Sequence, residues 1–137
     1  MPQTTTFGRL VITGAVGGVL GGVASLVLWL VAGAIGMPAA VNVTGQGVVD
    51  LAWFQFIGLS FFAGIGGGIV AGFLRNRPGG FRTFNIIAIV VLVISMIGPI
   101  AQPEEVAWST RIVLMITHVL VYITVVKAIQ REMANAG

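Results

Sequence analysis

The chain has 137 residues, of which 57% are hydrophobic and 8% charged, and its mean hydropathy is +1.04. Soluble domains have about a quarter of their residues charged, so this composition excludes an ordinary soluble protein and predicts a membrane protein. The absence of cysteine excludes disulfides and thiolate chemistry. Seven basic residues face four acidic ones. In a membrane protein an excess of basic residues sets the orientation of the chain in the bilayer. The basic residues therefore do not indicate nucleic-acid binding, and no nucleic-acid partner is expected.

Four long apolar segments follow one another along the chain. A helix needs roughly 20 apolar residues to cross the ~30 Å hydrocarbon core, and each segment is near or above that length. The connections between them contain turn-forming or charged residues and leave no room for a soluble module. The sequence therefore predicts one domain over residues 1–137, an all-α membrane protein built as a four-helix transmembrane bundle. The expected spans are residues 10–34, 53–74, 84–101 and 109–129.

Glycines recur at helical spacing in the first and second spans, beginning with "TGAVGGVLGGVAS" at residues 13–25. A phosphate-binding loop needs a strand before it and, in the P-loop form, a following Lys, and neither is present. Lipid supplies no hydrophobic force between helices, so smooth faces of small residues favour close packing of the glycine-zipper kind. The residues expected to pack in this way are Gly14, Gly18, Gly21, Gly22, Gly64, Gly67, Gly68 and Ala71.

A polar face distinguishes the last span, where Arg111, His118 and Tyr122 share one side of the helix. A histidine near the middle of a span is costly unless it is paired or faces the bundle interior, so His118 is a candidate functional residue. It either bonds a Ser, a Thr or a backbone carbonyl of a neighbouring helix, or serves as an axial ligand to haem or a chlorophyll-type pigment. Arg111 is expected to pair with Glu104 or Glu105.

Three residues are candidates for contact with a lipophilic ligand, namely His118, Tyr122 and Trp29, which shares the glycine face of the first span. The ligand would be a tetrapyrrole, a quinone or another lipophilic molecule lying against the glycine-rich faces. No carboxylate or second histidine lies within the spans, so we expect no catalytic dyad and no metal cluster. The sequence offers no catalytic residue, and His118 is the one candidate metal ligand.

Basic residues mark one end of the predicted bundle, because Arg75, Arg77 and Arg82 lie between the second and third spans. With four crossings, both termini fall at this same end. The positive-inside rule places it in the cytoplasm. Three of the four acidic residues fall at the opposite end, which is therefore expected outside. The six basic residues that agree on this orientation are Arg9, Arg75, Arg77, Arg82, Lys127 and Arg131.

The last span and the residues just before it, "STRIVLMITHVLVYITVVKAI" at 109–129, resemble a family of uncharacterised four-span integral membrane proteins of actinobacteria and related bacteria. The matching piece is His118-Val119-Leu120-Val121, and the resemblance covers the last third of the chain. It implies a multi-pass protein of the bacterial inner membrane. The family has no assigned activity, so the resemblance implies no function. A claudin-like relationship is set aside because the paired cysteines of that group are missing.

The sequence leaves three functions open. The leading one is a non-enzymatic accessory or structural subunit, because short loops leave only the lipid-facing sides to contact other membrane-protein subunits or a second copy. The second is the binding of a tetrapyrrole, quinone or other lipophilic ligand through His118. The third is transport of a small solute by an oligomer, since one chain places only His118 as an ionisable group at depth.

Overall fold

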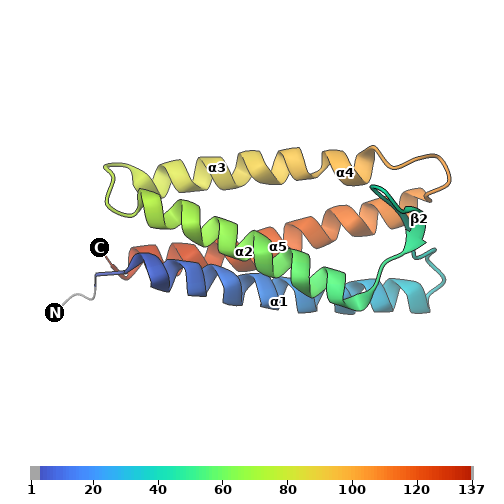
Figure 1. Cartoon of the computed structure of the whole chain (residues 1–137), viewed down its shortest axis with the longest axis horizontal. Coiled ribbons are helices and arrows are strands. Elements are labelled where there is room, and N and C mark those ends of the chain that lie inside the picture. Colours follow the sequence, from blue (N-terminus) through green and yellow to red (C-terminus); the bar gives the residue numbers. More distant parts are fainter. Residues whose placement is uncertain (1–3, 137) are drawn as a thin grey trace.

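The computed structural model describes residues 4–136 and contains four crossings that are long and apolar enough to span a bilayer. The third crossing is interrupted near its end, so it consists of a long and a short helix. The expected all-α transmembrane bundle is confirmed (Figure 1). The helices are α1 (Phe7–Ala34), α2 (Trp53–Leu74), α3 (Gly80–Ser95), α4 (Ile97–Ile100) and α5 (Trp108–Ala134).

Local sequence signals explain where these helices begin and break. The Thr6 side chain caps α1 by accepting a hydrogen bond from the Arg9 backbone N–H at 3.2 Å. Gln55 accepts the Ala52 backbone N–H at 2.7 Å and so supports the start of α2. Pro99 has no N–H to continue the backbone ladder, and the break between α3 and α4 lies just before it.

A β-hairpin, which the sequence analysis did not predict, lies in the connection between α1 and α2. Its strands β1 (Ala40–Val43) and β2 (Gly47–Asp50) are antiparallel. Gly45 and Gly47 have φ values of +85° and +78°, a region that glycine reaches without a steric penalty. Val41 is buried against the helix ends. The hairpin therefore covers this end of the bundle.

Both termini lie at the same end of the bundle as the connection between α2 and α3 (Figure 1). At this end Arg9 on α1 and Glu132 on α5 form an ion pair, with 2.9 Å between Nε and Oε1. Thr5 also donates to Glu132, at 2.6 Å. The connection with Arg75 thus lies at the end that carries the termini. The β-hairpin and the connection with Glu104 lie at the opposite end, as four crossings require.

Glycines of α1 bring the backbones of α1 and α2 into contact. A Cβ atom added to Gly14 would overlap the carbonyl oxygen of Gly64, and one added to Gly18 would overlap that of Ser60. At Gly22 the added atom would lie 2.7 Å from a carbonyl oxygen of α2. Any side chain at these positions would separate the two helices. The packing therefore depends on glycine, as expected for helices that adhere in lipid.

A second row of α1 glycines faces α5 instead. A Cβ added to Gly17 would lie 2.9 Å from the carbonyl oxygen of Thr124. A Cβ added to Gly21 would lie 2.8 Å from the Cα of Val121. Gly67 of α2 also faces α5. The single glycine face expected from helical spacing is thus divided between two neighbouring helices, and α1 lies in the groove between them.

The other two residues expected to pack, Gly68 and Ala71, lie near the end that carries the termini. A Cβ on Gly68 would overlap the carbonyl oxygen of Leu10. Ala71 is fully buried. Around it the helices form an apolar cluster that consists of Leu10, Ala71, Phe84, Val125, Val126 and Ile129.

The helix α3 packs less closely than the other three crossings. In its most apolar stretch 11% of the residues are buried, compared with 39% in α1. Its buried residues, Gly80 and Phe84, both lie in its first two turns. There the Gln130 side chain donates to the Asn85 side chain at 2.8 Å. As Figure 1 shows, α2 and α3 then diverge, so α3 is held mainly at one end.

Candidate functional site

A cavity of about 550 Å³ lies between α2, α3 and α5. Apolar side chains form most of its wall. Sites for small organic molecules typically measure about 300–1,000 Å³ and combine an apolar wall with a few polar groups. The cavity therefore has the size and chemistry of a ligand site. Its polar residues are Ser25, Gln55, Ser60, Ser95, Thr117, His118 and Tyr122.

The cavity opens sideways between α2 and α3. Its lining residues that remain exposed all come from these two helices. The outer surfaces of both helices are apolar and face lipid in a bilayer. A molecule entering the cavity would therefore come from the hydrocarbon core. The exposed lining residues are Leu59, Ala63, Gly66, Ile87 and Val91.

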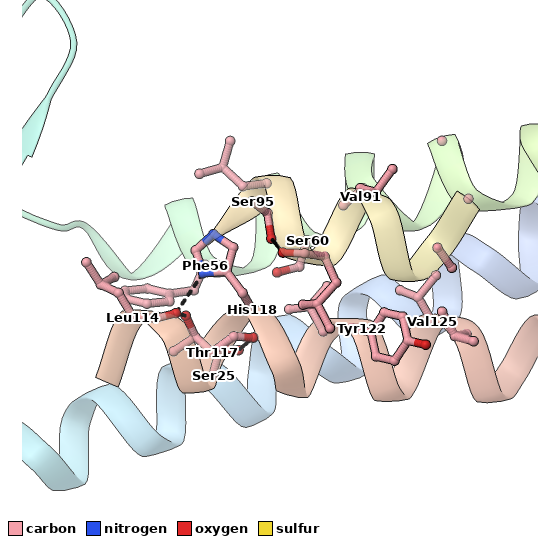
Figure 2. A pocket seen from close by; sticks show the side chains of 18 of the residues that line it. Ser25, Phe56, Ser60, Val91, Ser95, Leu114, Thr117, His118, Tyr122 and Val125 are labelled. Carbon is pink, nitrogen blue, oxygen red and sulfur yellow. Dashed lines mark hydrogen bonds between the residues drawn. The ribbon is translucent and has the colours of Figure 1, made fainter. Parts of the chain in front are cut away.

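His118 lies on α5 at the cavity wall, about 15 Å along the helix from Trp108. This distance places His118 near the middle of a ~30 Å hydrocarbon core. Its Nδ1 atom lies 2.6 Å from the carbonyl oxygen of Leu114, one turn earlier on the same helix. The sequence analysis expected this partner on a neighbouring helix, so that detail was wrong. In Figure 2 the other ring nitrogen, Nε2, points away from Leu114 toward the α3 side of the cavity.

Three of the polar side chains in the cavity are occupied within the protein. The hydroxyls of Ser25, Ser95 and Thr117 each donate to a backbone carbonyl, at distances between 2.6 and 3.3 Å. The bond from Ser25 joins α1 to α5, and the other two stay within their own helices. These groups stabilise the wall and are not left to meet a ligand.

The polar groups that remain are Nε2 of His118, the hydroxyls of Tyr122 and Ser60, and the side-chain NH2 of Gln55, whose oxygen already accepts from Ala52. Among the residues that the structure describes, none of these four groups has a hydrogen-bond partner. Tyr122 follows His118 by one turn of α5, and Ser60 belongs to α2 (Figure 2). The structure thus brings together two of the three ligand contacts expected from the sequence and adds Ser60.

A family model, described as a family of unknown function (DUF6069), matches residues 5–135. The chain belongs to DUF6069. No curated protein and no solved structure matches it. The family match extends over nearly the whole chain, whereas the resemblance found in the sequence covers the last third.

In this DUF6069 protein Trp29, the third expected ligand contact, lies apart from the cavity. Its side chain is 5% exposed and packs in a cluster with Val41 and Leu114. The centre of its ring lies 5.2 Å from that of Phe56, which does line the cavity. Trp29 therefore supports the wall from behind and does not form it.

The glycine face of α1 is also unavailable to a flat ligand. At Gly14, Gly18, Gly21 and Gly22, protein atoms fill the space that even one added Cβ would need. A tetrapyrrole or quinone lying on the glycine face of α1 is therefore excluded. In this DUF6069 protein the cavity instead lies between α2, α3 and α5.

Arg111, the third member of the polar face on α5, binds the loop before that helix. Its side chain is 6% exposed. Its Nε, Nη1 and Nη2 atoms donate to the carbonyl oxygens of Val106, Ile100 and Pro103 at 3.1, 2.9 and 2.7 Å, respectively. The guanidinium also lies over the ring of Trp108, 4.6 Å from its centre. Arg111 therefore closes the end of the bundle and takes no part in the cavity.

The expected pairing of Arg111 with Glu104 or Glu105 is wrong. Those carboxylates are exposed, and no ion pair joins either of them to Arg111 in the described part of the chain. The loop that contains Pro103 is not regular, so its carbonyl oxygens need donors from elsewhere. A guanidinium has five N–H donors and meets this need. The nearby Pro99 and Pro103 were the sequence signal for this arrangement.

Sequence reasoning missed Ser60 and the whole contribution of α3 to the cavity. Ser60 is a lone hydroxyl in the middle of a glycine-rich apolar run, and its depth in the span was a usable signal. Ala88 and Val91 on α3 carry no comparable signal, because they are ordinary apolar residues of a spanning helix. Their role follows only from the position of α3 relative to His118.

Proposed function

We propose that the protein binds a small lipophilic molecule in the cavity between α2, α3 and α5. The observation that carries this proposal is the apolar cavity itself, which opens toward lipid and contains an unpaired Nε2 of His118. An apolar cavity without an occupant loses the packing contacts of its whole wall, which disfavours leaving it empty. An occupant from the bilayer would restore those contacts.

The proposal is one of binding without chemical conversion. The polar groups at the cavity are amide, hydroxyl and imidazole groups, and none of its lining residues is a carboxylate or a basic side chain. Within residues 4–136 no three side chains of the metal-ligating kinds form a cluster. The protein would thus hold a lipophilic molecule near the middle of the bilayer, as a carrier, a store or a sensor does.

Photolabelling tests where such a molecule binds. A prenyl alcohol that carries a diazirine should label the cavity wall of the protein in lipid nanodiscs, on α5 around His118 and Tyr122 and on α2 around Ser60. Excess unlabelled prenyl alcohol should suppress this labelling, because a cavity of about 550 Å³ saturates. Labelling spread evenly over the lipid-facing sides of the helices, without competition, would contradict the proposal.

We also propose that the end with the termini faces the cytoplasm, in the inner membrane of a bacterium. The support for this orientation is the distribution of charge, because Arg75, Arg77 and Arg82 lie at that end and Glu104 and Glu105 lie at the other. A cytoplasm-specific reporter fused after the last residue should be active, and the same reporter inserted in the β-hairpin should be inactive. The reverse pattern would overturn this orientation.

An accessory role in a larger membrane complex is a second proposal. It is favoured by one exposed apolar face of α1, which points away from α2 and α5 and is available to other membrane-protein subunits, to a second copy or to lipid. A stoichiometric partner that stays bound in mild detergent would support this role. The exposed residues of that face include Ile12, Val16, Leu20, Val23 and Val27.

A further inference from the structure

We infer that the ligand of the cavity is a lipophilic alcohol or phenol whose hydroxyl donates a hydrogen bond to Nε2 of His118. This inference rests on the proposed function and names the chemical class of its ligand. It follows from which ring nitrogen of His118 carries the proton, from the apolar character of the cavity wall and from the position of His118 at the middle of α5.

The hydrogen bond to Leu114 determines which nitrogen of His118 carries the proton. A carbonyl oxygen accepts hydrogen bonds and cannot donate them, so the 2.6 Å contact requires the proton on Nδ1. An imidazolium would be costly in the apolar interior of a membrane protein, so the ring is neutral. A neutral imidazole with its proton on Nδ1 has a lone pair on Nε2. His118 therefore offers the cavity an acceptor.

This acceptor discriminates between two kinds of lipophilic molecule. A hydroxyl placed at Nε2 donates to it and completes the hydrogen bonding of His118. The carbonyl group of a quinone, ketone or ester would instead place a second acceptor there, and both acceptors would stay unpaired in an apolar surrounding. Tyr122, one turn farther along α5, can donate or accept, so it does not distinguish the two kinds.

Haem fits the cavity less well, although Nε2 could ligate its iron. The propionates of haem need basic partners, and no Arg or Lys is among the residues that line the cavity. The lone pair of Nε2 is therefore assigned to a hydroxyl.

The single histidine makes a direct test feasible, since protein labelled with ¹⁵N-histidine gives the ring signals of His118 alone. In nanodiscs without added probe, the two nitrogens should report a neutral ring with its proton on Nδ1. Farnesol should then shift the Nε2 signal. Its methyl ether has the same chain but no donor and should leave the Nε2 signal unchanged.

Binding of the two probes to His118→Leu provides the matched control. Wild-type protein should prefer farnesol over the ether roughly 2- to 10-fold, the range expected for one net hydrogen bond. The variant should bind both probes about equally, because leucine keeps the apolar wall and removes the acceptor. If His118 had only a structural role, the substitution would lower the affinity for both probes alike and leave the preference for farnesol intact.

The outcomes separate this inference from the proposed function. If both probes bind with equal affinity, or if Nε2 carries the proton, the hydroxyl assignment falls and ligand binding stands. A haem-type absorption band in the purified protein would also overturn the assignment. If neither probe competes with photolabelling of the cavity, the proposed function itself fails.

Discussion

Replacing Gly18 by valine should destabilise the bundle by about 3 kcal/mol, the upper part of the range for overpacking. The first atom of the new side chain would overlap the carbonyl oxygen of Ser60. That obstacle is backbone, which cannot rotate away, so α1 and α2 must separate along their whole contact. Unfolding in mixed micelles measured by circular dichroism would report the loss.

Gly33→Val is the matched control on the same helix. An added Cβ at Gly33 meets no atom within 4 Å, so this change should alter stability by less than about 0.5 kcal/mol. If both substitutions changed the stability equally, the helix propensity of valine would account for the loss. In that case the close contact between α1 and α2 would not be what stabilises the bundle.

Replacing Arg111 by methionine should cost about 3 kcal/mol, because the buried carbonyl oxygen of Val106 and the partly buried ones of Ile100 and Pro103 would lose their charged donor together. The effect should be local at first. Hydrogen exchange should accelerate in residues 100–107 and at the start of α5, while α1 keeps its protection. Exchange and thermal unfolding on the same sample measure both parts of this expectation.

Two further substitutions separate shape from charge. Arg111→Lys keeps the charge but replaces the planar fork by a point donor, so it should recover only part of the stability. Arg82→Met removes an exposed guanidinium and should leave unfolding nearly unchanged. If Arg111→Met were as harmless as Arg82→Met, the account of Arg111 as the residue that holds this loop would be wrong.

The parts of the fold that could be predicted depend on local sequence. A span is a run of apolar residues of fixed length, so hydropathy identifies the four crossings before any packing is known. Helical spacing likewise places Gly14 and Gly18 on one face. The division of the α1 glycines between α2 and α5 could not be predicted in this way. It depends on which helices lie beside α1, and spacing along one helix contains no information about its neighbours.

The candidate site was predicted in part for the same reason. His118 and Tyr122 stand out because polar groups are rare at depth in a span, and the structure places both at the cavity. Trp29 shares the glycine face by spacing, yet α2 and the hairpin cover it. The pairing expected for Arg111 relied on opposite charge, whereas carbonyl groups in an irregular loop compete successfully for a buried guanidinium.

The most direct test of the central claim is photolabelling by the diazirine prenyl alcohol in two variants of α2. Gly66 lines the cavity and Gly58 does not, and an added Cβ at either position meets no atom within 4 Å. Gly66→Leu should therefore obstruct the cavity and abolish competable labelling around His118, whereas Gly58→Leu should retain it. Labelling that persists equally in both variants would contradict a ligand site between α2, α3 and α5.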